Sequence, residues 1–198
     1  MAGRRAGAGL VLTAAGLTAA GCLGSATKTV THTQTVISTE TVTTTGSVKS
    51  AKPCRGTDLA ATFAVIPNSA GAGQIAYALT VKNTSAGACT VQGIPKGTLL
   101  TANGTALLTH VKASGGAGKP VVLPLGASAT AQARFSPDIA GEGDSQSGAC
   151  QPQAHTFEVT AEGGGVTEAA IKPPTSVCVQ GTLNFQAFDY AGEIVPLG

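Results

Sequence analysis

A serine, two histidines and several aspartates could together form a hydrolase triad. Gly143-Asp144-Ser145 has the Gly-Asp-Ser order of serine hydrolases, with Ser145 as the nucleophile. Trypsin-like enzymes continue with Gly-Gly, whereas Gln146-Ser147 follows here, and the chain has no Gly-x-Ser-x-Gly elbow. The base and the acid would come from His110, His155, Asp138 and Asp58, but neither histidine stands in a recognisable motif. An extracytoplasmic serine hydrolase using Ser145 is therefore the alternative hypothesis, and a protein that is not an enzyme is favoured.

Two further motifs lack the spacing that their chemistry requires. The glycine-rich Gly115–Pro120 stretch contains Gly-Lys, but a Walker A loop would need Gly at position 113 and Ser or Thr at position 120. Ala113 and Pro120 stand there. Three acidic residues could form a calcium loop, yet their spacing matches no known ligand pattern; they are Asp138, Glu142 and Asp144. We expect no metal and no cofactor.

The chain begins with the layout of a secretory signal. Two arginines precede Ala6–Ala20, an uncharged stretch rich in Ala, Gly and Leu. This stretch is shorter than the roughly 20 residues that span a bilayer. Ala19-Ala20-Gly21-Cys22 resembles the bacterial lipobox, with Ala19 where Leu is usual. The resemblance implies removal of residues 1–21 and attachment of palmitate-type lipid to Cys22; an ordinary signal peptide is the alternative.

A threonine-rich tract follows and fills most of residues 22–53. Threonine favours strands, but polar groups would occupy both faces of any strand here. Because the tract has almost no large apolar residues, it cannot offset the entropy cost of ordering. We expect a flexible tether, either plain or carrying O-linked sugar.

Composition narrows the classes of partner. The formal net charge is +2, and both signal arginines would leave on cleavage. Nucleic-acid binding needs a concentrated basic face, so we expect no nucleic-acid partner. Trp is absent and Tyr numbers two, which leaves few rings on which sugars could stack. A protein partner is therefore favoured over a sugar.

Residues 54–198 have the pattern of an all-β domain. Short apolar or alternating runs recur between turn-rich breaks, without a sustained period of 3.6 residues. Asn103-Gly104 is the clearest hairpin signal. We predict an immunoglobulin-like antiparallel β-sandwich. The predicted strands are Asp58–Ile66, Ile75–Lys82, Cys89–Gly93, Gly97–Thr101, Ala106–Lys112, Val121–Leu123, Ala127–Phe135, His155–Ala161, Val166–Ile171 and Leu183–Tyr190.

Four cysteines in this domain predict two disulfides. They are an even set behind a secretory signal, which is typical of extracytoplasmic disulfide-bonded proteins. Three pairings are possible, and we favour Cys54–Cys89 with Cys150–Cys178, because each pair then joins neighbouring elements. A zinc site is the competing interpretation, but no Cys-x-x-Cys or close Cys/His spacing exists.

Three turn motifs add a family resemblance. Asn83-Thr84-Ser85 precedes Cys89, Gly93-Ile94-Pro95 follows it, and Pro124-Leu125-Gly126 precedes a later predicted strand. With Cys54 and Asp58-Leu59, these residues resemble the actinobacterial domain of unknown function 4232, found in secreted proteins and lipoproteins. The resemblance implies a fold and no activity. From the residues alone, Asn83 is expected to cap the backbone of a turn.

These observations favour a lipid-anchored, non-catalytic binding or protein-interaction module. It would be held by Cys22 on the extracytoplasmic face of the cell membrane. Its partner would be an envelope protein or another extracellular molecule.

Overall fold

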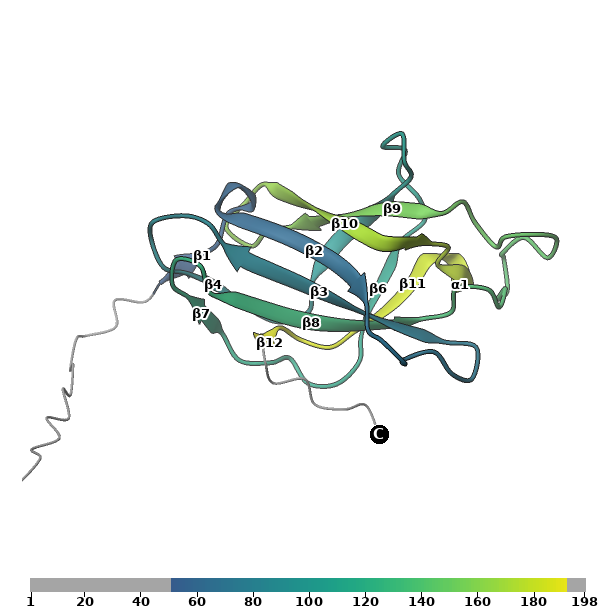
Figure 1. Ribbon diagram of the computed structural model, residues 1–198, viewed down its shortest axis with the longest axis horizontal. Helices are drawn as coiled ribbons and strands as arrows, with labels where there is room; N and C mark the ends of the chain where they lie inside the picture. Colours follow the sequence, from purple (N-terminus) through teal and green to yellow (C-terminus); the bar gives the residue numbers. More distant parts are fainter. Residues whose placement is uncertain (1–50, 192–198) are drawn as a thin grey trace, which may run out of the picture. The chain divides into compact units, whose positions relative to one another are not determined.

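The computed structural model describes residues 51–191 (Figure 1). The predicted signal peptide, the lipid-bearing Cys22 and the threonine-rich tract up to residue 50 lie outside the described residues. Residues 192–198 also lie outside them. Within residues 51–191, no helix has the length and apolarity needed to cross a membrane.

The domain is built from two sheets. The small sheet has three strands in the order β1-β4-β7, and the large sheet has nine, in the order β5-β9-β10-β2-β3-β8-β11-β6 with β12 beside β8. In Figure 1 the small sheet lies at one end of the domain and α1 at the other. The strands are β1 (Lys52–Pro53), β2 (Leu59–Val65), β3 (Ile75–Asn83), β4 (Cys89–Val91), β5 (Lys96–Leu100), β6 (His110–Ala113), β7 (Val121–Leu123), β8 (Ser128–Phe135), β9 (Ala154–Thr160), β10 (Val166–Thr175), β11 (Thr182–Phe185) and β12 (Asp189–Tyr190).

The predicted β-sandwich with two disulfides is confirmed. Most strand pairs are antiparallel, and three are parallel: β1 with β4, β2 with β10, and β6 with β11. The helical content of the described residues is one 3-10 turn, η1 (Gly56–Asp58), and one short helix, α1 (Cys178–Gly181). Lys52 and Pro53 pair with β4, so the ordered strands begin just before the predicted boundary at Cys54.

The large sheet curls until its two ends approach each other. The Asn103-Gly104 hairpin brings the chain back along β5, where the Leu107 amide donates to the Leu99 carbonyl at 2.8 Å. The Leu99 amide then donates to the Thr109 hydroxyl at 2.9 Å. Because a side chain replaces the backbone acceptor at Thr109, the regular ladder stops there. The predicted strand Ala106–Lys112 is therefore reduced to an isolated bridge at Ala106 and the strand β6.

The predicted strand Leu183–Tyr190 is also interrupted. The Gln186 amide still bonds the Gln132 carbonyl of β8, but the Phe188 amide donates to the Gly93 carbonyl near the small sheet. Phe188 is thereby buried, and the chain returns to β8 as β12. Burial of one ring between the sheets thus divides the predicted strand into β11 and β12.

The core contains nearly all of the aromatic residues. Four of the five phenylalanines and Tyr77 form one chain of ring contacts, with centroids 5.2–5.8 Å apart. Such pairs add about 0.5–1.5 kcal/mol each to their area burial. The Tyr77 hydroxyl donates to the Pro173 carbonyl at 2.9 Å, and burial raises the pKa of this phenol. A sequence with few rings therefore concentrates them inside the curled large sheet, whose strands β2, β3, β8, β9 and β11 carry all five.

Candidate functional site

The residues of the hydrolase hypothesis make local structural contacts. The Ser145 hydroxyl donates to the Ser147 carbonyl at 2.9 Å. Within residues 51–191 no hydrogen bond joins it to His110 in β6 or His155 in β9. The Asp58 carboxylate accepts the Arg55 amide at 2.9 Å and closes η1. These contacts give Ser145 no activating base.

Asp144 holds a strained turn in place. Its carboxylate accepts the backbone amides of Gly141, Val179 and Gln180 at 2.8, 2.5 and 2.7 Å. The bonds from Gly141, Gln180 and Val179 hold the pKa of this carboxyl below its usual value. Val179 and Gln180 have φ values of 56° and 54°, a left-handed conformation that a β-branched residue rarely adopts. The carboxylate therefore stabilises an unusual backbone.

The predicted disulfides are both present, and one of them lies beside Asp144. Cys54–Cys89 has an S–S distance of 2.03 Å and Cys150–Cys178 one of 2.08 Å. In the described part of the chain, the one group with metal-ligand geometry is Asp144 with Cys150 and Cys178. Both sulfur atoms are bonded to each other, so they are not thiolate ligands. Asp138 and Glu142, the other members of the predicted calcium loop, are not part of this group.

The turn motifs have the structural roles expected of them. Asn83 is fully buried, and its amide donates to the carbonyls of Gly87 and Leu123, each at 2.8 Å. Its oxygen accepts the amide and the hydroxyl of Ser85. Asn83 thus joins the end of β3, the turn that follows it and β7.

Gly118, in the glycine-rich stretch, has a φ of +71°, and a Cβ there would lie 2.5 Å from the side chain of Ala187.

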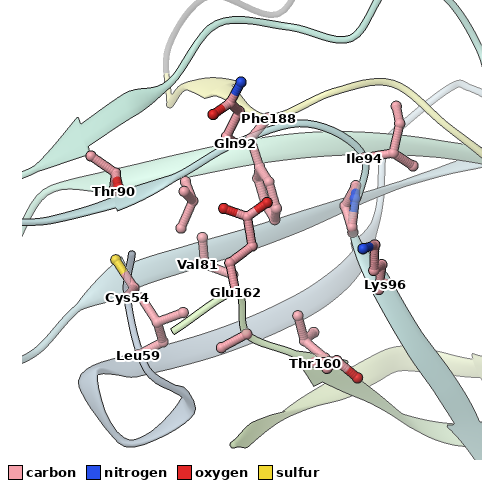
Figure 2. A pocket seen from close by; sticks show the side chains of 14 residues that line it. Cys54, Leu59, Val81, Thr90, Gln92, Ile94, Lys96, Thr160, Glu162 and Phe188 are labelled. Carbon is pink, nitrogen blue, oxygen red and sulfur yellow. The ribbon is translucent and has the colours of Figure 1, made fainter. Parts of the chain in front are cut away.

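A small apolar pocket lies where the two sheets meet. Figure 2 shows Val81, Leu59 and Phe188 around it, with the charged ends of Glu162 and Lys96 on the solvent side. Its volume is about 30 Å³, which corresponds to roughly one water molecule. Small-molecule sites typically have roughly 300 Å³ or more. The pocket is a packing gap between sheets and not a ligand site.

A larger polar surface lies on the outer side of β6, β11 and β8. Strand register places Lys112, Asn184 and Arg134 in one row across these strands. Because side chains alternate along a strand, the residues two positions away share the same face. We call this surface the polar face; its residues are His110, Lys112, Ser114, Gln132, Arg134, Thr182, Asn184 and Gln186.

Two grooves follow the polar face. The first has a volume of about 380 Å³ and is lined by Arg134, Asn184 and neighbouring amide side chains. The second, of about 510 Å³, is lined by His110 and Lys112 and reaches the strained Val179-Gln180 turn. Glu142 also lines the second groove. Both grooves are open depressions of the surface, and polar side chains form most of their walls.

Gln132 in the first groove has an unsatisfied polar atom. The side chain is 9% exposed, although it points away from the core. Its Oε1 is buried and has no hydrogen-bond donor among the described residues. A buried acceptor without a partner costs about 1–3 kcal/mol, so native proteins contain few of them. An unpaired acceptor therefore lies at the wall of the first groove.

Sequence reasoning missed the polar face. The available signal was the alternation of polar residues in Ser128–Arg134 and Thr182–Gln186. That alternation shows which residues point outward, but not that β6 and β8 flank β11. Their pairing with β11 connects residues 50 or more positions apart, and one of the two pairs is parallel.

Comparison with known proteins gives a family and no activity. The family model described as Domain of unknown function (DUF4232) matches residues 54–189. No curated protein and no solved structure matches the chain. The matched range includes both disulfides, the Asn83 turn and all residues of the polar face. The chain therefore belongs to the DUF4232 family.

Proposed function

We propose that this protein is a lipid-anchored, non-catalytic interaction module on the extracytoplasmic side of a cell membrane. The observation that carries the interaction part is the polar face with its two grooves. Eight polar side chains project there from three paired strands. Because strand pairing already fixes the backbone, such a surface binds a partner with little loss of backbone conformational entropy.

The contacts of the acidic and hydroxyl groups also support a non-catalytic role. Asp144 is engaged by three backbone amides, and Ser145 bonds within its own loop. A serine nucleophile needs a base within hydrogen-bonding reach, or one brought there by substrate. The binding role therefore accounts for more of the geometry than the Ser145 hydrolase does.

Two sequence features support the anchor. Cys22 follows the small residues of the lipobox-like motif, and it is the one cysteine outside the two disulfides. More than one acyl chain gives stable membrane attachment, at roughly 0.8 kcal/mol per buried methylene. The proposed partner is an envelope protein that meets the domain beyond the bilayer.

Metabolic labelling with an alkyne-bearing palmitate analogue tests the anchor. The wild-type protein should carry the label and partition with membranes, whereas Cys22→Ala should lose the label and appear in the medium. Ser25→Ala, a substitution three positions along, should behave as wild type. Persistent labelling of Cys22→Ala would refute the lipoprotein assignment.

Proximity labelling from the same chain tests the interaction role. A promiscuous biotin ligase fused to the protein should label a reproducible envelope protein in wild type and in Ser145→Ala alike. A label pattern indistinguishable from that of an unrelated anchored domain would refute the interaction role. Loss of a cellular phenotype in both Ser145→Ala and His155→Ala would favour the hydrolase.

A further inference from the structure

We propose that the polar face binds an extended acidic segment of the partner protein. This inference rests on the proposed function and specifies the chemistry of its partner. The structural basis is the juxtaposition of Lys112 and Arg134 on either side of Asn184, next to the unpaired acceptor of Gln132.

The charges of the polar face favour an anionic partner. Only 11% of the chain is charged, yet Lys112 and Arg134 stand in one row, with His110 two positions from Lys112. No carboxylate lies within 4.0 Å of either cation among residues 51–191. Glu142 is the one acidic side chain that lines the grooves. The two cations are therefore available to a carboxylate supplied by a partner.

The spacing of the cations suits an extended chain. Neighbouring strands lie roughly 4.8 Å apart, and β11 lies between β6 and β8, so two such spacings separate the backbones of Lys112 and Arg134 by roughly 10 Å. Carboxylates on one side of an extended peptide recur about every 7 Å. The long side chains of lysine and arginine can adjust to this difference. One extended segment can thus place successive acidic groups near both cations.

The amides of the polar face match a peptide backbone. Each Asn or Gln side chain offers a donor and an acceptor, as a peptide group does. Gln132, Asn184 and Gln186 project into the first groove, and Gln74 lines its edge. A backbone N–H of the bound segment would supply the donor that Gln132 Oε1 lacks. The same groups would hydrogen-bond sugar hydroxyls, but no aromatic ring lines either groove for stacking.

The test uses the full-length chain in detergent and two synthetic peptides of about ten residues, long enough to span both grooves when extended. One peptide alternates Asp and Thr; the other carries Asn in place of every Asp. We expect fluorescence anisotropy to show binding of the acidic peptide that weakens with salt, and no binding of the Asn peptide. Equal binding of both peptides would overturn the inference.

Two sets of variants locate the binding. Lys112→Gln with Arg134→Gln should weaken binding of the acidic peptide by roughly tenfold or more. The matched control is Lys52→Gln with Lys96→Gln, which removes the same charge from exposed lysines on β1 and β5, strands that do not carry the polar face, and should bind as wild type. Equal weakening in both double variants would show that net charge, not the polar face, attracts the peptide.

Gln132→Met separates binding from stability. Methionine has a similar length and removes the unpaired acceptor, so the melting temperature should rise by roughly 3 °C. Binding of the acidic peptide should weaken at the same time, because the ligand donor loses its acceptor. Undiminished binding by Gln132→Met would remove Gln132 from the site.

The outcomes distinguish this inference from the proposed function. If proximity labelling identifies an envelope protein that the Lys112→Gln, Arg134→Gln variant still labels, the protein is an interaction module and the polar face is not its contact. Salt-dependent binding of polygalacturonate, without binding of the acidic peptide, would replace the peptide segment by an anionic glycan. If neither labelling nor peptide binding is found, both proposals fail.

Discussion

Replacing Asn83 by alanine should destabilise the domain strongly, although Asn83 lies at the end of a strand, next to a turn. The Asn83 side chain is fully buried at the end of β3 and makes four hydrogen bonds. The bond to the Leu123 carbonyl is fully buried and joins segments 40 residues apart. The other three involve Ser85 and Gly87, where water can replace a lost partner.

The magnitude follows from these contacts. Leaving the buried Leu123 carbonyl without its donor costs about 1–3 kcal/mol. The partly exposed bonds contribute about 0.5 kcal/mol each, and the missing amide leaves a small cavity. We expect Asn83→Ala to lower the free energy of unfolding by about 3 kcal/mol. Ser85→Ala, which removes only the exposed part of the network, should lower it by about 1 kcal/mol or less.

Urea unfolding under non-reducing conditions measures both values. Far-ultraviolet circular dichroism is the suitable signal, because the chain has no tryptophan. Asn83→Asp keeps the acceptor for Ser85 but directs a carboxylate at two carbonyls, and it should cost more than Asn83→Ala. An equal and small loss of unfolding free energy in Asn83→Ala and Ser85→Ala would refute the role of the buried bond to Leu123. A stable Asn83→Ala protein that no longer binds its partner would instead make Asn83 a binding residue.

Three further predictions concern the disulfides, Asp144 and Ser145. Replacing both cysteines of Cys54–Cys89, or both of Cys150–Cys178, should cost about 3.8 and 3.6 kcal/mol from their separations of 35 and 28 residues; urea unfolding showing no loss would contradict this. Because backbone hydrogen bonds lower the pKa of Asp144, its stabilisation should be complete above about pH 4 and lost as the pH falls further. The difference in unfolding midpoint between wild type and Asp144→Asn should therefore shrink in acid, with Asp138→Asn as the control; a difference that grows in acid would reverse the sign of the argument. Ser145→Ala should leave partner binding within about twofold of wild type in the anisotropy assay, and a larger loss would give Ser145 a functional role.

Local sequence patterns predicted most of the strands. Alternation in Ile75–Lys82 and Ala127–Phe135 places one apolar side chain after another on the inner face, so both strands were predicted nearly to their ends. The breaks were predictable because Gly126 and Gly93 adopt positive φ values, which glycine favours. The largest differences from the structure lie at Thr109 and Phe188, where contacts with other segments interrupt a predicted strand, and in β10, which runs four residues beyond the predicted end at Ile171.

The disulfide pairing was also accessible from sequence. Two consecutive predicted strands lie between Cys54 and Cys89, and two others lie between Cys150 and Cys178, so each of these pairs joins neighbouring elements. The tertiary structure shows, in addition, the turn that lies beside the disulfide Cys150–Cys178. Cys178 begins α1, whose left-handed Val179-Gln180 turn is held by Asp144 from a distant loop. No local propensity predicts this turn, because valine disfavours that conformation.

The sequence by itself determined the class of domain, its disulfide pairs and the turns that separate its strands, since these depend on periodicity, residue type and short-range geometry. Tertiary structure alone decided the polar face. Lys112, Arg134 and Asn184 belong to segments that are distant in sequence and come together only through the pairing of β6, β11 and β8. Strand order and register are set by packing of the whole core, and no local pattern encodes them.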